Sequence, residues 1–205
     1  MTKAILFDLG NVLVGFDFKR GYSNIESCCR LQASQIPEVI GGSGLVPLFE
    51  RGQVSGEEFF QKISLLLGLT VSYERFCGLW SAIFLPSPLV SESLLSGLRQ
   101  RYRMVLVSNT NEIHFQMIRQ NYALLEHFDS YVLSYQVGAM KPAEQMFAEA
   151  VRQADCRPEE CFYTDDVLEF VEGGRRYGLD AVQFRGATEL EQELTRRGIQ
   201  WNELS

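Results

Sequence analysis

The chain has 205 residues, of which 46% are hydrophobic and 22% are charged, and its formal net charge is −7. These values are typical of a globular protein with a substantial core, and they exclude a disordered or fibrous chain. The negative net charge also argues against nucleic acid as a partner, because proteins that bind nucleic acid usually carry a basic patch.

The N-terminal segment passes from Met1 directly into an apolar run, without the succession of charged, apolar and small residues found in a signal peptide. No apolar stretch reaches the roughly 20 residues that a helix needs to span a bilayer. The five cysteines are an odd number without zinc-ligand spacing, and we interpret them as reduced thiols. We therefore expect a cytoplasmic protein without a membrane partner.

Five short apolar runs are predicted to form strands. Helical patterns separate most of them, and this alternation is typical of an α/β fold, here a Rossmann-like parallel sheet with crossover helices. In chain order the runs are residues 4–9, 104–108, 131–134, 161–164 and 181–184.

More than ninety residues separate the first two strands, far more than an ordinary crossover requires, so this segment contains an insertion. Apolar residues at helical spacing predict helices over residues 18–31, 54–67 and 72–84. Ser55 and Glu58 form a capping-box pattern that supports the start of the second helix.

The insertion defines the expected domain organisation. An α-helical bundle over residues 16–86 is inserted into a core domain made of residues 1–15 and 87–205, with hinges near 14–18 and 84–88. Further helices are predicted in the core domain from the same spacing of apolar residues. They cover residues 90–98, 111–121, 143–154, 168–177 and 189–197.

Polar residues follow four of the predicted strands, at the carboxyl ends where ligands bind in open α/β sheets. They are Asp8, the pair Ser108 and Asn109, Lys141 after a loop, and the pair Asp165 and Asp166. A carboxylate nucleophile, a hydroxyl, an amide, a cation and an acidic pair together suit metal-assisted phosphoryl transfer. Mg²⁺ prefers such oxygen ligands, and neighbouring carboxylates repel each other unless a cation lies between them.

Each of these residues also has a simpler interpretation when it is taken alone. Asp8 and Ser108 are suited to turns, Asp165 and Asp166 to the N-terminal cap of the next helix, and Lys141 to a solvated surface. The order and combination of the four segments favour the chemical interpretation.

Some polar residues lie outside the strand ends. His114 and His127 are interpreted as surface or packing residues rather than catalysts. Residues 50–52, Glu-Arg-Gly, interrupt the apolar pattern of the insertion and are interpreted as a solvated loop, although a loop facing the site is the alternative.

The four segments and the helical insertion resemble the haloacid dehalogenase superfamily with a C1-type cap, over residues 3 to 186. The first motif, Asp-Leu-Gly-Asn-Val beginning at Asp8, is similar to that of small phosphatases that include glucose-1-phosphatase-like members. The resemblance implies that Asp8 attacks the phosphorus of a small-molecule phosphate ester, such as a sugar phosphate, and forms an aspartyl-phosphate. It names no protein partner.

The same resemblance implies roles for the other residues. Ser108 and Asn109 would bind the phosphoryl oxygens, and Lys141 would pair with Asp8 and the phosphate. The implied catalytic residues are thus Asp8, Ser108 and Lys141. The implied Mg²⁺ ligands are Asp8, the backbone carbonyl of Gly10, Asp165 and Asp166, with Asp166 favoured as the direct ligand.

One departure from the family pattern concerns the general acid. Phosphatases of the superfamily usually carry a second aspartate two residues after the nucleophile, and here that position is Gly10. Loss of a general acid typically costs about 10²–10⁴-fold in rate. Asp17 is the nearest acidic candidate for a replacement, although it also suits the start of the first inserted helix.

Two other functions are compatible with Gly10. A 2-haloacid dehalogenase uses a similar aspartate without a second one, but such enzymes resemble this chain less because neutral residues replace the pair at Asp165 and Asp166. The other alternative is a catalytically weakened member that binds a phosphorylated ligand or a partner.

Overall fold

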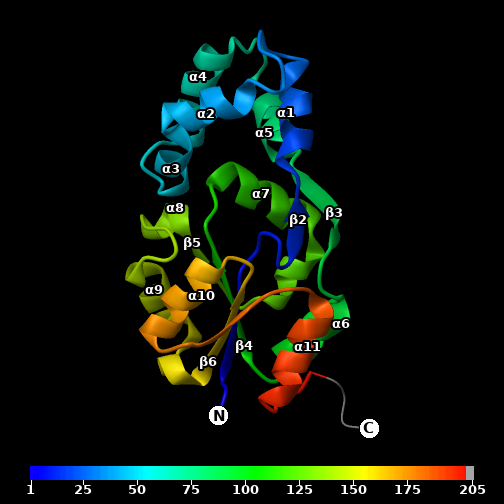
Figure 1. Ribbon diagram of the computed structural model, residues 1–205, viewed down its shortest axis with the longest axis vertical. Coiled ribbons are helices and arrows are strands. Elements are labelled where there is room, and N and C mark those ends of the chain that lie inside the picture. Colours follow the sequence, from blue (N-terminus) through cyan, green and yellow to red (C-terminus); the bar gives the residue numbers. More distant parts are fainter. Residues whose placement is uncertain (202–205) are drawn as a thin grey trace.

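The computed structural model describes residues 1–201, and its centre is a five-stranded parallel sheet with strand order β5-β4-β1-β6-β7 (Figure 1). Each strand lies within two residues of its predicted run, which confirms the α/β fold with a parallel sheet. The strands are β1 (Ala4–Phe7), β4 (Arg103–Ser108), β5 (Ser130–Leu133), β6 (Cys161–Asp165) and β7 (Asp180–Gln183).

Helices cover both faces of the sheet, and each begins and ends within two residues of its prediction. One face packs against α6 (Glu92–Arg99), α7 (Glu112–Asn121) and α11 (Ala187–Arg196). The other face packs against α9 (Glu144–Ala154) and α10 (Leu168–Tyr177). The short helical segments are η1 (Ala123–His127), α8 (Ser134–Val137) and η2 (Pro158–Glu160).

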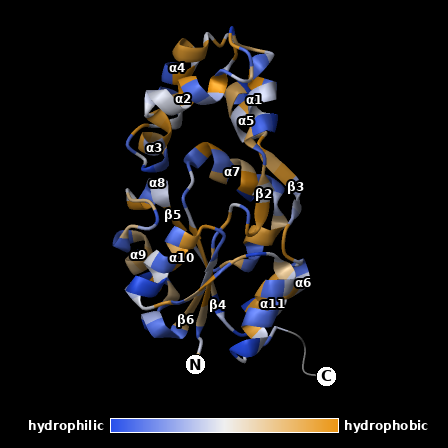
Figure 2. Cartoon of the chain, in the orientation of Figure 1, coloured by the Kyte–Doolittle hydropathy of each residue, from blue (hydrophilic) through white to orange (hydrophobic). Residues whose placement is uncertain are grey.

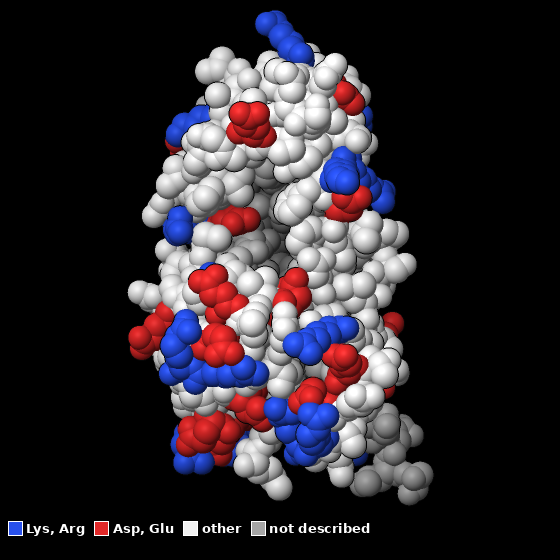
Figure 3. Space-filling view, viewed as in Figure 1, with Lys and Arg blue, Asp and Glu red and all other residues white. Residues whose placement is uncertain are grey.

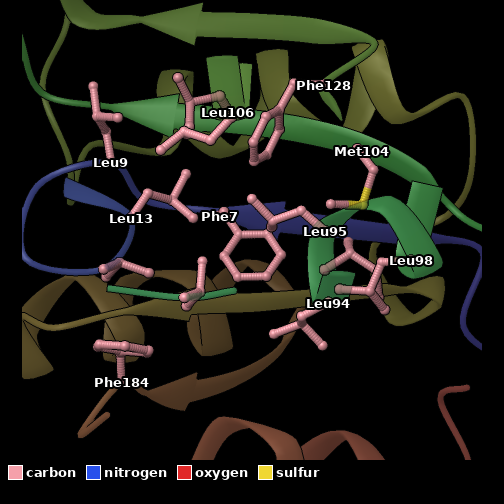
Figure 4. Packing of buried hydrophobic residues seen from close by; sticks show 14 of the residues in the cluster. Phe7, Leu9, Leu13, Leu94, Leu95, Leu98, Met104, Leu106, Phe128 and Phe184 are labelled. Atoms are coloured by element: carbon pink, nitrogen blue, oxygen red, sulfur yellow. The ribbon is translucent and has the colours of Figure 1, made fainter. Parts of the chain in front are cut away.

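The central strand β1 contributes to both halves of the core because successive strand residues point to opposite faces. Ile5 and Phe7 pack into one apolar cluster and Ala4 and Leu6 into the other, and all four are fully buried. Figure 4 shows Phe7 within the first cluster. A strand buried on both faces is rigid, so it positions the residue that follows it.

The insertion is a bundle of five helices packed around an apolar cluster, which Ile113 at the start of α7 also joins. Within it the ring of Phe59 stacks on Phe49, with centroids 4.3 Å apart. Hydrophobic and hydrophilic residues alternate along these helices (Figure 2). The helices are α1 (Phe18–Glu26), α2 (Ile36–Ser43), α3 (Leu45–Glu50), α4 (Gly56–Leu67) and α5 (Tyr73–Ser81).

The ends of the inserted helices follow local capping chemistry. The hydroxyl of Ser55 accepts a hydrogen bond from the Glu58 N–H at 3.2 Å, as the capping pattern predicts. Gly68 ends α4 in the left-handed conformation, with φ of 66°. Helices α2 and α3 were not among the predicted elements. Gly41 and Gly42 have low helix propensity and weaken the pattern of α2, and α3 has only 6 residues, one of them proline.

The two expected hinge segments pair with each other in a two-stranded antiparallel ribbon. It consists of β2 (Val14–Phe16) and β3 (Phe84–Pro88), and Phe16 lies opposite Phe84. The helix predicted to reach residue 84 therefore ends at Ser81, since proline at positions 86 and 88 favours extended backbone. Within residues 1–201, none of the helices combines the length and the apolar character needed to cross a membrane.

Candidate active site

Three polar side chains meet where the adjacent strands β1, β4 and β6 end. Asp8 follows β1 directly, and Ser108 and Asp165 are the last residues of β4 and β6. The parallel pairing of β1 with both neighbours brings the three ends to one edge of the sheet. The Asp8 N–H donates to the carbonyl of Thr164 at 3.0 Å, and this bond fixes Asp8 beside Asp165. All three side chains are buried.

Lys141 is the cation of the site, and it is only 4% exposed. Its ammonium donates to Asp8 Oδ1 at 2.5 Å, to Asp165 Oδ2 at 2.6 Å and to the Val107 carbonyl at 3.0 Å. Burial disfavours the charged ammonium, but the carboxylates of Asp8 and Asp165 outweigh burial and raise the pKa of Lys141.

Asn109 holds the backbone of the lysine loop against the end of β4. Its side-chain oxygen accepts from the Lys141 N–H at 2.7 Å, and its side-chain nitrogen donates to the Lys141 carbonyl at 3.1 Å. Both bonds use the amide of a single side chain, so the position of the loop depends on this asparagine.

The two adjacent aspartates differ in their surroundings. Asp165 is fully buried, and its oxygens accept hydrogen bonds from Lys141, from the Tyr163 hydroxyl and from the Val167 N–H. Asp166 is half-buried, and its carboxylate accepts a hydrogen bond from the Asn11 side chain at 3.3 Å. Asp166 therefore retains more capacity to bind a cation than Asp165 does.

The three aspartates form a cluster of oxygen ligands. Asp8, Asp165 and Asp166 can each offer a carboxylate oxygen within 4.8 Å of those of the others. Burial raises the pKa of Asp8 to about 7 even though Lys141 lowers it, and burial followed by the charge of Asp165 raises the pKa of Asp166. One lysine does not neutralise three carboxylates, so a divalent cation with oxygen ligands fits this cluster.

A cavity of about 110 Å³ lies between these strand ends and the helical insertion. Gly10, Ser108 and Asn109 line its core side. A second cavity of about 340 Å³ extends into the insertion. Figure 3 shows the surface hollowed between the insertion and the core, with acidic side chains at the edge of the hollow. The residues that line both cavities are Phe18, Glu50, Ile83 and His114.

Sequence comparison places this arrangement in a known family. The sequence model described as "haloacid dehalogenase-like hydrolase" matches residues 2–178. The chain belongs to this family. Membership accounts for the α/β core with a helical insertion.

Individual relatives in the family cover almost the whole chain. A D-ribitol-5-phosphate phosphatase of Bacteroides thetaiotaomicron is 26% identical over 95% of this chain and 98% of its own length. A haloacid dehalogenase-family enzyme of the same species, in complex with magnesium and inorganic phosphate, has a TM-score of 0.79 at 26% identity, over 91% of this chain and 96% of its own. The L-2-haloacid dehalogenase of Xanthobacter autotrophicus shares the fold, with a TM-score of 0.64 at 18% identity, over 98% of this chain and 85% of its own.

The hydrolase has a cavity residue that sequence reasoning placed in a solvated loop. Glu50 is the last residue of α3, and it lines both cavities. Burial raises its pKa to about 7, against the opposing charge of Arg51. The solvated-loop interpretation is therefore wrong for this residue, because it ends a helix and lies half-buried at the cavity wall. The sequence signal for Glu50 was the interruption of the apolar pattern at residues 50–52.

His114 is a packing residue, as expected, but it also lines both cavities of the hydrolase. Its ring stacks on Trp80 at 5.7 Å between centroids, and its Nε2 lies 3.1 Å from the Trp80 carbonyl oxygen. Its Nδ1 lies 3.1 Å from Asn111 Nδ2. Burial lowers its pKa to about 4, so the ring is neutral at pH 7.

Gly10 occupies the position at which related phosphatases carry the general acid, and Asp17 is the nearest acidic candidate to replace it. Asp17 is exposed, and its side chain caps α1 by accepting from the Lys19 N–H at 2.9 Å. It is absent from the lining of both cavities. A Cβ built on Gly10 would lie 2.9 Å from Cε1 of the Phe16 ring, so that ring occupies the space of a side chain at position 10.

Proposed function

We propose that this hydrolase is a Mg²⁺-dependent phosphatase that acts on a small phosphorylated metabolite, a sugar phosphate or a similar monoester. The observation that carries the proposal is the buried Lys141 ammonium between Asp8 and Asp165, beside a third carboxylate. Two relatives support the proposal: one is a phosphatase, and the structure of the other contains magnesium and inorganic phosphate.

In this proposal Asp8 is the nucleophile. Its carboxylate oxygen bonds to phosphorus as the alcohol leaves, and water then releases phosphate from the aspartyl-phosphate. Ser108 and Asn109 bind the phosphoryl oxygens, and Lys141 neutralises charge on Asp8 and on the phosphate. Burial of Asp8 at a rigid strand end holds the nucleophile in one position.

The proposed Mg²⁺ site consists of oxygen ligands: Asp8, the Gly10 carbonyl, Asp165 and Asp166. Asp166 is the favoured direct ligand, because Asp165 is already bonded to Lys141, Tyr163 and Val167. A bound Mg²⁺ supplies positive charge that offsets repulsion between the carboxylates and the phosphate.

We also propose a finer classification. Residues 16–86 form a C1-type cap, residues 1–15 and 87–205 form the core domain, and the chain belongs with the small phosphatases whose first motif reads Asp-Leu-Gly-Asn-Val. The apolar cluster of the insertion differs from the two clusters that cover the sheet, although Ile113 of α7 joins it. This cluster and the connection through the β2–β3 ribbon support the division.

Phosphate release from a panel of sugar phosphates and 4-nitrophenyl phosphate, with Mg²⁺ and with chelator, tests the proposal. We expect Mg²⁺-dependent turnover that Asp8→Asn abolishes and that the exposed control Asp17→Asn retains. Chelator-resistant halide release from a 2-haloacid would instead support a dehalogenase. Absence of both activities would leave a ligand-binding or partner-binding role.

A further inference from the structure

The residues that line the larger cavity indicate which kind of substrate it can bind. It lies among α1, α2, α3 and α5, with the start of α7 on one side. Its walls are mostly hydrophobic side chains, including Phe18, Tyr22, Ile40, Val46, Trp80 and Ile83. Four residues line both this cavity and the one at the strand ends, so the two cavities adjoin. A phosphate ester bound beside Gly10 and Ser108 can extend into the larger cavity.

Few polar groups in this cavity are available to a ligand. Asn111 and His114 bond to each other, and His114 also bonds to the Trp80 carbonyl. The remaining side-chain groups are the carboxyl of Glu50, the hydroxyl of Tyr22 and the indole Nε1–H of Trp80, which is buried and has no hydrogen-bond partner among the described residues. A polyol chain would leave several hydroxyls against hydrophobic walls, at a cost of about 1–3 kcal/mol for each unpaired group.

We propose that this cavity binds the leaving group of the substrate, and that the substrate is a phosphate monoester of an alcohol with a hydrophobic, ring-sized body. The inference rests on the proposed phosphatase function, and among phosphate monoesters it favours a hydrophobic alcohol over a sugar as the leaving group. A volume of about 340 Å³ lies within the usual range of small-molecule pockets, about 300–1,000 Å³.

Alkyl monoesters with similarly poor leaving groups test this subsite. We expect kcat/KM for 2-phenylethyl phosphate to exceed the values for ethyl phosphate and ribitol 5-phosphate by about tenfold or more. Equal values, or a preference for the polyol, would overturn the inference. If the protein releases phosphate from no ester, the proposed function fails instead.

Two neighbouring glycines of α2 provide matched variants. Gly41 lines the cavity and Gly42 does not, and a Cβ built on either meets no atom within 4 Å apart from the local helix backbone. Gly41→Leu should lower kcat/KM for 2-phenylethyl phosphate by about tenfold and leave ethyl phosphate within about twofold. Gly42→Leu should leave both substrates unchanged. Equal losses for both substrates in Gly41→Leu would contradict a leaving-group subsite.

A second inference concerns proton transfer, and a different observation carries it. Gly10 supplies no carboxyl, and the Phe16 ring occupies the space of one. Glu50 lines the same cavity as Gly10 and Ser108. Among residues 1–201 the structure gives the Glu50 carboxyl no hydrogen bond or ion pair, so it is available to a substrate.

The geometry points to Glu50 as the general acid and base of the proposed phosphatase. As Asp8 bonds to phosphorus, the bond from phosphorus to the leaving oxygen breaks and that oxygen takes the proton of Glu50. The Glu50 carboxylate then takes a proton from water while the water oxygen bonds to phosphorus. The bond to Asp8 breaks, and inorganic phosphate leaves.

The titratable surroundings of Glu50 are consistent with this role. Arg51 is its charged neighbour, and Tyr22 and His114 are the other titratable groups that line a cavity with it. A carboxyl whose pKa is about 7 is present in both protonation states near neutral pH.

Glu50→Gln tests this role, with the exposed cap residue Glu38→Gln as a matched control. We expect Glu50→Gln to lower kcat/KM for ethyl phosphate by about 10²-fold or more, and for 4-nitrophenyl phosphate by less than about fivefold, because nitrophenolate leaves without a proton. The decline of kcat/KM for ethyl phosphate above about pH 7 should disappear in the variant.

Three results would overturn this assignment. They are an equal loss for both esters, retention of the wild-type pH profile, and an effect on KM alone. An inactive wild-type protein would refute the phosphatase function itself.

Discussion

Lys141 and Asp165 form an ion pair with both side chains removed from water. The ammonium lies 2.6 Å from Asp165 Oδ2, and the side chains are 1% and 0% exposed. The same ammonium contacts Asp8 at 2.5 Å. Removal of one charge from a buried ion pair leaves the opposite charges without a partner. The resulting loss of stability is larger than that from removing an exposed ion pair.

Lys141→Met should therefore lower the free energy of unfolding by about 3–5 kcal/mol, because two buried carboxylates lose their cation. Urea denaturation without added metal measures this change. Lys62→Met removes an exposed ion pair with Glu58 and should cost less than about 1 kcal/mol. Similar losses in the two variants would contradict the neutralising role of Lys141.

Mg²⁺ should stabilise the protein against thermal unfolding. At a concentration about 100 times its dissociation constant, a ligand specific to the folded state adds about 2.7 kcal/mol. Asp166→Asn should remove most of this stabilisation, whereas the exposed neighbour Glu169→Gln should keep it. Melting curves with Mg²⁺ and with chelator measure the effect, and equal responses of the two variants would argue against Asp166 as a ligand.

His114 should make the protein less stable in acid. Its pKa is about 4 when folded and 6.5 in the reference state, so the unfolded chain takes up the proton first as the pH falls. The contribution of the neutral ring to the free energy of unfolding is fully present above pH 6.5, and it is lost as the pH falls through 4. At about 1.4 kcal/mol per pKa unit, the loss is roughly 3 kcal/mol.

The difference in unfolding free energy between wild type and His114→Gln, followed by urea denaturation from pH 7.5 to pH 4, isolates this contribution. It should shrink toward acid pH. A difference that is constant across this range would show that His114 stays uncharged or titrates alike in both states.

Gly10→Asp should not create an efficient general acid. The new side chain meets the Phe16 ring, and such overpacking costs about 1–3 kcal/mol of stability. Phe16→Ala combined with Gly10→Asp should recover part of that loss, with Phe16→Ala alone as the reference. Phosphate release and urea denaturation measure both effects, and a Gly10→Asp single variant of wild-type stability would contradict the packing argument.

Local sequence determined much of the fold. The five core strands and the helices that cover them follow from apolar periodicity, and Ser55, Ser72 and Asn111 cap helices through their own side chains. The polar residues at the ends of β1, β4 and β6 are equally visible, because parallel strands in one sheet end at the same edge. Lys141 lies in a loop after β5 and α8 and joins them there. These features depend on residues close together in the chain.

The tertiary structure alone decided how the insertion meets the core. The pairing of β2 with β3, the enclosure of Glu50 and the contact between Gly10 and Phe16 join residues whose own neighbours in sequence do not indicate the contact. The raised pKa of Glu50 arises from burial by several elements together, and no single segment encodes it. The sequence shows which residues carry charge. Only the assembled chain shows which of these residues are removed from solvent, because burial depends on several elements together.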